Sequence, residues 1–388
     1  MKKIFALLLS LCMVLSLCAC GGAKEEPKAE EPKAEAPVEA PVEETPVEEP
    51  EAEMAVAMIT DYGDITDQSF NQTTYEACKA YCEANGVEFK YYKPASDSDD
   101  DRVAMIEMAI DEGFNVIVTP GYAFANALKA TAGEYPEATF IALDVGEGDF
   151  GDYALPQNLY SAVYQEELCG YMAGYAAVKL GYEKLGYLGG MAVPAVVRYG
   201  FGFVQGADAA AAEMGKNIEM NYAYGNQFFG DADITAAMDT WYEAGTEVVF
   251  ACGGGIYISA AEAAAKVGGK VIGVDVDQAG IIDGAYGEGM TVTSAMKGLA
   301  ATVKTLLTKV TEGTFEGGKI ETLGLVSEVP EENYVQIAGS TQFADGFTAE
   351  DYAALVAAMF NGEITVSNAI DAMPETTNTT VNDLGNLK

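Results

Sequence analysis

Residues 56–72, VAMITDYGDITDQSFNQ, combine an apolar strand, a polar loop and a helix start, and this order decides the fold. The spacing from Ser69 to Gln72 is that of a capping box, which predicts a helix that begins at Ser69 with Phe70 and Asn71 in its first turn. The first N–H groups of a helix lack partners within the helix. The loop before this helix is therefore a candidate ligand-binding segment.

The same sequence of strand, loop and helix recurs along the chain. Further apolar runs begin at residues 87, 115, 139, 185, 247 and 271, with helical patterns between them. These strands are continuously apolar instead of alternating, so we expect parallel sheets that are covered on both faces. The predicted fold class is therefore α/β, with doubly wound parallel sheets.

Interruptions of this pattern near residues 157–165 and 287–294 predict that the chain passes between two lobes. We place the crossings near residues 160, 292 and 330. The N-terminal lobe is then expected to contain residues 54–160 and 292–330. The C-terminal lobe is expected to contain residues 161–291 and 331–388, with a ligand cleft between the lobes.

The first 53 residues have the features of an exported lipoprotein. Two lysines precede an apolar run from Ile4 to Leu17, which is shorter than the roughly 20 residues that span a bilayer. The run ends at Cys20 in a context that resembles the bacterial lipobox; the alternative is ordinary signal cleavage beside a chance cysteine. We expect a signal peptide at 1–19 and a lipid on Cys20. We also expect a disordered Pro/Glu-rich tether over 20–53.

Composition restricts the partners and the chemistry. The net charge of −39 disfavours nucleic acid and anionic membrane surfaces, so the N-terminal lipid is the only expected membrane contact. The chain has no histidine, which removes Ser-His and Cys-His nucleophiles. Cys78, Cys82, Cys169 and Cys252 show neither disulfide-framework nor metal-site spacing. We expect no metal, no cofactor and no catalytic residue.

Polar loops follow the predicted strands at their carboxyl ends. They read TDYGD, TPGY, LDVGEG, LGGM, ACGGG and VDVDQ. In open α/β sheets this edge is where ligands bind. Each loop alone is compatible with an ordinary turn, but the repeated carboxylates and glycines together indicate a binding site.

The run TDYGDITDQSFNQTTYEAC at 60–78 resembles the start of the basic membrane lipoprotein family. Further similar blocks follow in order: FIALDVG, GYLGGMAVPAVVRYGFGFVQGA, VVFACGGG, VIGVDVDQ and TVTSAMKG. The resemblance spans most of the chain after the tether. It implies a type I periplasmic-binding-protein fold and a monomeric, non-enzymatic receptor on the outer face of the bacterial cell membrane. Such a receptor captures nucleosides, purine nucleosides in particular, and delivers them to an ABC transporter permease.

The resemblance also implies a ligand site made of Asp61, Phe70, Asn71, Asp144, Tyr199, Gly254, Asp275 and Lys297. Phe70 would stack on one face of the base, and Tyr199, or Phe201 if the alignment shifts, on the other. Asp275 would hold the ribose hydroxyls. Stacking contributes roughly 1–3 kcal/mol per base, and charge-assisted hydrogen bonds suit neutral hydroxyls.

The remaining implied residues have narrower roles. Asp61 and Asn71 would line the cleft beside the base, and Asp144 would supply an acceptor from the same lobe. Gly254 would let the backbone approach the ligand, and Lys297 would keep the acidic pocket from repelling itself. Such a pocket suits an uncharged nucleoside better than a nucleotide.

Two other functions are compatible with the same residues. A receptor for a sugar or signalling molecule on this fold would also combine aromatic rings, an amide and carboxylates. A secreted nucleoside hydrolase would use paired carboxylates, and release of free base from inosine would reveal it. An NAD-dependent enzyme is disfavoured, because the glycines near 188 and 252 do not form G-x-G-x-x-G.

Overall fold

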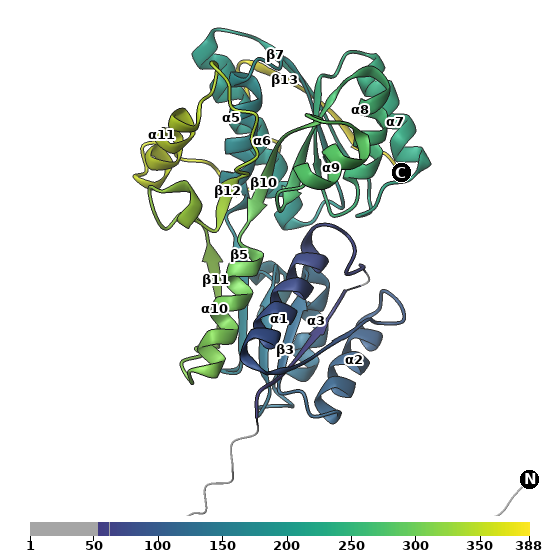
Figure 1. Cartoon of the computed structure of the whole chain (residues 1–388), viewed down its shortest axis with the longest axis vertical. Coiled ribbons are helices and arrows are strands. Elements are labelled where there is room, and N and C mark those ends of the chain that lie inside the picture. Colours follow the sequence, from purple (N-terminus) through teal and green to yellow (C-terminus); the bar gives the residue numbers. More distant parts are fainter. Residues whose placement is uncertain (1–52, 62) are drawn as a thin grey trace, which may run out of the picture. The chain divides into compact units, whose positions relative to one another are not determined.

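The computed structural model describes residues 53–61 and 63–388 (Figure 1). The predicted signal peptide, Cys20 and the tether up to residue 52 lie outside the described residues. No helix in the described part of the chain has the length and apolarity that a membrane span requires.

The first sheet has six strands, all parallel, and contains the predicted apolar runs of the N-terminal lobe. Their order is β11 (Lys319–Leu323), β5 (Leu159–Tyr164), β4 (Thr139–Leu143), β3 (Val116–Pro120), β1 (Ala55–Ile59) and β2 (Glu88–Tyr92). The central strands are buried on both faces, as their unbroken apolar sequences require.

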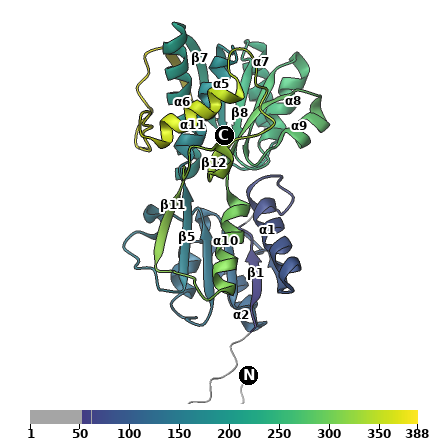
Figure 2. The same ribbon diagram turned by 60° about the vertical axis from the view of Figure 1, so that its left-hand side comes forward.

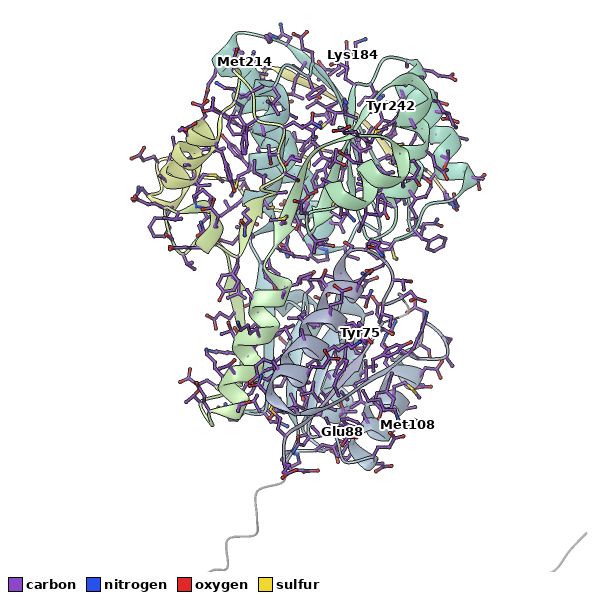
Figure 3. The ribbon with its side chains drawn as sticks, viewed as in Figure 1. Tyr75, Glu88, Met108, Lys184, Met214 and Tyr242 are labelled. Carbon is purple, nitrogen blue, oxygen red and sulfur yellow. The ribbon has the colours of Figure 1, made fainter. Side chains whose placement is uncertain are left out.

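Helices cover both faces of this sheet. They are α1 (Phe70–Asn85), α2 (Asp99–Asp111), α3 (Ala125–Thr131), the short α4 (Glu147–Phe150), the 3₁₀ turn η1 (Tyr122–Phe124) and α10 (Leu299–Thr311). Tyr75 lies on α1 (Figure 3). The centre of its ring lies 5.6 Å from that of Phe89 and 5.5 Å from that of Tyr91, both on β2. The returning helix α10 lies beside α1 (Figure 2), where the hydroxyls of Tyr81 and Thr311 are 2.8 Å apart.

The second sheet has seven strands. Their order is β12 (Val335–Ile337), β10 (Thr291–Lys297), β9 (Lys270–Asp275), β8 (Val248–Cys252), β6 (Lys184–Gly189), β7 (Ile218–Tyr224) and β13 (Thr379–Asn386). Only β12, among these, runs antiparallel to its neighbour. The prediction of two parallel α/β sheets is therefore confirmed.

The helices of the second lobe are α5 (Glu166–Lys179), α6 (Pro194–Met214), α7 (Ala232–Glu243), α8 (Tyr257–Val267), α9 (Ala279–Tyr286), α11 (Ala349–Phe360) and the 3₁₀ turn η2 (Pro330–Glu332). Helices α5 and α6 touch backbone to backbone. A Cβ atom added at Gly170 would lie 2.0 Å from the carbonyl oxygen of Tyr199, and one at Gly202 would lie 2.1 Å from that of Glu167. Glycine at these positions therefore lets the two helices pack against each other in backbone contact.

The lobe boundaries differ from the predicted ones by a few residues. Strand β5 belongs wholly to the first sheet, so the first crossing follows Tyr164 and not residue 160. Strand β10 belongs wholly to the second sheet, so the second crossing is at Gly298 and not near 292. The prediction of a break over 287–294 is wrong for its last residues, because the segment from Thr291 pairs with β9 and is buried from Thr291 to Ala295.

Candidate functional site

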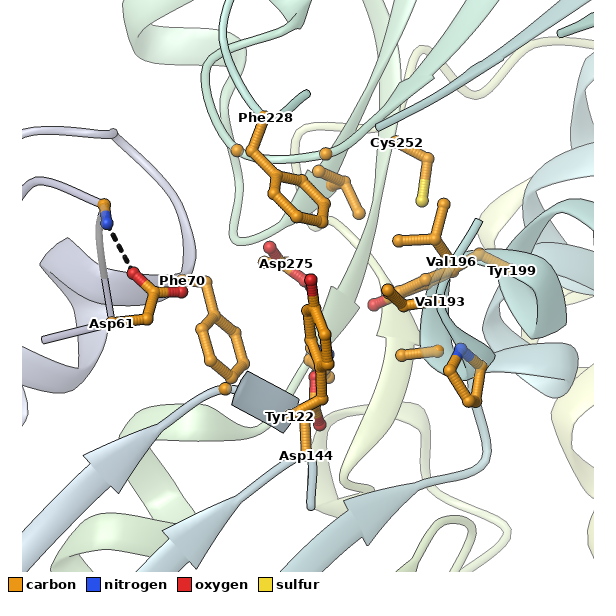
Figure 4. A pocket seen from close by; sticks show the side chains of 18 of the residues that line it. Asp61, Phe70, Tyr122, Asp144, Val193, Val196, Tyr199, Phe228, Cys252 and Asp275 are labelled. Carbon is orange, nitrogen blue, oxygen red and sulfur yellow. Dashed lines mark hydrogen bonds and ion pairs between the residues drawn. The ribbon is translucent and has the colours of Figure 1, made fainter. Parts of the chain in front are cut away.

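A cavity of about 910 Å³ lies between the carboxyl ends of the two sheets (Figure 4). Its walls include every predicted site residue: Asp61, Phe70, Asn71, Asp144, Tyr199, Gly254, Asp275 and Lys297. Figure 4 shows the rings of Phe70, Tyr122 and Phe228 around one space, with Asp144 and Asp275 beside it. Loops that are far apart in the sequence thus converge on a single site.

The start of α1 is held by Asp67 and not by the predicted capping box. The Asp67 carboxylate accepts the backbone N–H groups of Ser69, Asn71 and Gln72 at 2.9, 2.9 and 3.0 Å. Ser69 is the N-cap residue but its side chain makes no capping bond. The helix begins where the sequence predicts, but Asp67 already accepts the N–H groups of Asn71 and Gln72 in its first turn, which are therefore not available to a ligand.

Asn71 presents an unpaired acceptor to the cavity. Its side-chain nitrogen donates to Asp67 Oδ2 at 3.2 Å, whereas its buried Oδ1 has no hydrogen-bond partner among the described residues. Leaving a buried acceptor unsatisfied costs about 1–3 kcal/mol. A bound molecule that donates a hydrogen bond to Asn71 Oδ1 would recover this cost.

Asp61 lies next to Asn71 on the cavity wall. Its Oδ1 accepts the backbone N–H of Gly63 at 2.5 Å. Burial raises the pKa of Asp61 to about 6. A Cβ atom at Gly63 would lie 2.4 Å from Asn71 Nδ2, so glycine is required to bring this loop against the helix start.

Lys297 is buried at the centre of a cluster of carboxylates. It forms an ion pair with Asp144 of the other lobe, and its Nζ lies 3.5 Å from Glu166 Oε1 and 3.8 Å from Asp275 Oδ1. Burial lowers its pKa, but the three carboxylates outweigh this effect and raise the pKa of Lys297. Lys297 is therefore charged and offsets part of the negative charge of the site.

Two carboxylates of this cluster, Asp144 and Asp275, have unusual pKa values and backbone conformations. Burial raises the pKa of Asp144 to about 6 and also raises the pKa of Asp275. Asp144 Oδ1 is buried without a hydrogen-bond partner among the described residues. Both residues have positive φ angles, 61° and 65°, a conformation that is uncommon for residues other than glycine but that Asp tolerates better than most.

Glu166 and Arg198 belong to the same cluster and were missed in the sequence. Glu166 is fully buried, and its Oε2 accepts from Arg198 Nε at 2.7 Å. Arg198 lines the cavity. The available signal was a pair of glutamates, Glu166 and Glu167, close to the predicted crossing between the lobes near residue 160.

Two aromatic residues of the second lobe line the same cavity as Phe70. Tyr199 lines the cavity but is only 1% exposed, and its ring packs edge-on against Phe250 at 5.9 Å. Phe228, which sequence reasoning missed, is partly buried in the loop after β7 and also lines the cavity. Phe201 does not line the cavity; its ring packs against Tyr222 at 6.2 Å.

The glycine runs make room for Phe228. A Cβ atom at Gly190 would lie 2.5 Å from the Phe228 ring. Gly254 has φ +52°, and a Cβ atom there would lie 2.9 Å from the Phe228 carbonyl oxygen. The LGGM and CGGG segments thus place the Phe228 loop against the sheet edge.

Comparisons with known proteins identify the relatives of this chain. The family model described as ABC transporter substrate-binding protein PnrA-like (Bmp) matches residues 54–342. The ABC transporter nucleoside-binding protein BmpA of Lactococcus lactis subsp. cremoris is 28% identical, over 71% of this chain and 80% of its own length. An uncharacterized lipoprotein of Pyrococcus abyssi is 25% identical, over 76% of this chain and 72% of its own.

A solved ABC transporter solute-binding protein of Aeropyrum pernix K1 shares the fold, with a TM-score of 0.63 at 22% identity. The match covers 80% of this chain and 87% of that one. The predicted type I periplasmic-binding-protein fold is therefore confirmed.

Proposed function

Because the chain belongs to the PnrA-like family of ABC transporter substrate-binding proteins, which are not enzymes, we propose that it captures purine nucleosides for an ABC importer. One observation carries the proposal. Phe70 borders a cavity that also contains two buried acceptors, Asn71 Oδ1 and Asp144 Oδ1, to which no group of the described residues donates a hydrogen bond. A nucleoside supplies both a flat ring system and several hydrogen-bond donors.

The base would lie against Phe70 of the first lobe. Asp61 and Asn71, which flank this ring, both offer oxygen atoms to N–H groups at the edge of a base. On the opposite side the second lobe offers Tyr199 and Phe228. Stacking on such rings contributes roughly 1–3 kcal/mol per base.

The ribose would lie toward Lys297, Asp144 and Asp275. A carboxylate accepts hydrogen bonds from neutral hydroxyls about twice as strongly as an uncharged acceptor does. Asp144 and Asp275 come from different lobes, so a sugar between them would contact both. Contacts with both lobes stabilise the closed form of a two-lobed binding protein.

The charges of the site disfavour a phosphorylated ligand. Lys297 is already paired with Asp144 and close to two more carboxylates, and Arg198 is paired with Glu166. Lys297 and Arg198 are therefore already neutralised by carboxylates, and a phosphate group in the cavity would be repelled by those carboxylates. We accordingly propose nucleosides, and not nucleotides, as ligands.

We further propose that a lipid on Cys20 anchors the protein to the outer face of the cell membrane. The lipobox-like sequence and the lipoprotein among its relatives support this proposal. Radiolabelled palmitate should be incorporated into the wild type, and Cys20→Ser should abolish the label and release the protein into the medium. Incorporation that persists in Cys20→Ser would contradict the proposed anchor.

A thermal-shift panel of nucleosides, free bases, nucleotides and sugars tests the proposed ligand class. A ligand at 100 times its dissociation constant adds about 2.7 kcal/mol to the unfolding free energy. Guanosine, inosine or adenosine should raise the melting temperature, whereas ribose and AMP should not. A shift with hexoses alone would favour the sugar receptor instead.

A further inference from the structure

Two side chains outside the cavity wall connect the lobes. Ser69 precedes α1 in the first lobe, and its hydroxyl donates to Asp275 Oδ2 of the second lobe at 2.6 Å. Gln278 precedes α9 in the second lobe, and its Nε2 donates to the carbonyl oxygen of Gln68 at 3.1 Å. Ser69 and Gln278 are both fully buried, and neither lines the cavity.

Each lobe positions its part of this contact. Gln68 has φ 56°, an uncommon conformation for a residue other than glycine. Its N–H donates to Gln72 Oε1 at 3.1 Å, and Asp67 holds the N–H of Ser69. The first lobe thus presents one carbonyl group and one hydroxyl group in a fixed turn.

The second lobe holds Gln278 equally firmly. Its Oε1 accepts the N–H of Val274 at 2.9 Å, and its backbone N–H donates to Ser294 Oγ at 3.1 Å. A Cβ atom at Gly273 would lie 2.8 Å from Gln278 Oε1, so glycine lets the side chain fold back over the strand. Only the Nε2 group of this side chain is directed to the other lobe.

We propose that Ser69 and Gln278 form an interlobe latch that stabilises the closed form and orients Asp275 toward the ligand. Separation of the two loops would break both hydrogen bonds, and water would replace them. Because Asp275 lines the cavity and also accepts from Ser69, closure and ligand contact share one carboxylate. The latch therefore couples occupancy of the cavity to closure of the lobes.

The latch predicts a specific loss when either donor is removed. Each of Ser69→Ala and Gln278→Ala should weaken guanosine binding roughly 3- to 10-fold, the equivalent of one net hydrogen bond, mainly through faster dissociation. Ser69→Thr keeps the hydroxyl and should restore most of the affinity. Gln278→Glu keeps an acceptor for Val274 but replaces the donor, so it should bind no better than Gln278→Ala.

Matched controls remove comparable bonds within one lobe. Ser161 is fully buried and donates to Val145 at 2.7 Å inside the first lobe. Gln342 donates to Gly289 and Thr291 at 3.0 and 2.7 Å inside the second lobe. Ser161→Ala and Gln342→Ala should change the melting temperature without a comparable change in the guanosine dissociation rate.

The experiment combines guanosine dissociation rates with small-angle X-ray scattering of the full chain, with and without guanosine. Ser69→Ala/Gln278→Ala should be more extended than the wild type under the same conditions, and unchanged dimensions together with unchanged dissociation would overturn the latch. The latch rests on the proposed function only in that guanosine is the ligand used to test it. If guanosine fails to bind the wild type, the proposed ligand is wrong. The latch is then tested by the radius of gyration of the ligand-free protein alone. Equal radii for the wild type and the double variant overturn it.

Discussion

The ammonium group of Lys297 lies 4.8 Å from the centre of the Phe70 ring, although the two residues belong to different lobes. The same ammonium group is paired with Asp144. Phe70 therefore stands where the aromatic part of the cavity meets its charged part. A ligand with a flat ring joined to a hydroxylated sugar matches this division.

Removal of the Phe70 ring tests the aromatic part. Phe70→Ala should weaken guanosine binding roughly 5- to 100-fold, because it removes one stacking surface. Calorimetric titration would measure the effect. Phe360→Ala, which removes a 42% exposed ring of α11, is the control and should bind as the wild type does. Equal affinities for both variants would show that Phe70 only packs against the core.

The second stacking ring can be identified by comparing two variants of the other lobe. Phe228→Ala should weaken guanosine binding at least 5-fold with little change in melting temperature, because this ring is only partly buried. Tyr199→Leu should mainly lower the melting temperature, since Tyr199 is almost fully enclosed. The opposite pattern, with affinity lost only in Tyr199→Leu, would assign the stacking role to Tyr199.

Loss of the Lys297 charge should destabilise the fold. Lys297→Met leaves buried carboxylates without their cation, which costs about 3–5 kcal/mol of unfolding free energy. Lys297→Met/Asp144→Asn should recover part of this loss. In urea denaturation Lys266→Met is the control, because Lys266 is an exposed partner of Asp239 and should change stability by less than about 1 kcal/mol. A Lys297→Met variant as stable as the control would contradict the cluster's role.

The raised pKa of Asp61 predicts how stability and binding depend on pH. Its ordinary value is 3.8, and burial raises the pKa to about 6 in the folded protein. Between these values the folded form holds a proton that the unfolded form has released. The contribution of this group to stability therefore falls as pH rises from about 4 to 6, and is constant above.

Asp61→Asn isolates this contribution from those of Asp144 and Glu167, whose pKa values burial also raises. The stability difference between wild type and Asp61→Asn should change between pH 4 and 6 and be flat from pH 6.5 to 8. Guanosine binding to the wild type should weaken below pH 6, because a protonated Asp61 is a poorer acceptor. A pH-independent stability difference would contradict the burial of this carboxyl group.

Sequence patterns predicted much of the fold because burial on both faces forces continuous apolar strands. The same rule placed Asp144 and Asp275 at strand ends, where parallel strands bring their following loops together. Strands β5, β7, β11 and β13 were not among the predicted apolar runs, and neither was β10, which bears directly on the site. The threonines and serine of β10 look like a loop, yet they are buried in the sheet and carry Lys297 into the cavity.

Local competition for hydrogen bonds could not be resolved from the sequence. Asp67 and Ser69 are both good caps for α1, and only the nearby second lobe, which takes the Ser69 hydroxyl, decides between them. Phe228 lies in a loop without periodicity, so its position depends on the distant glycines that make room for it. Such contacts depend on tertiary structure and carry no short-range signal.

Calorimetric titration of the full chain with guanosine, followed by D-galactose, tests the central claim most directly. The proposed function predicts saturable binding of one guanosine per protein, no heat from galactose, and no free guanine after the titration. The proposed function would be contradicted if the protein bound galactose but not guanosine. It would also be contradicted if guanine were released from guanosine in an amount that increases with the protein concentration.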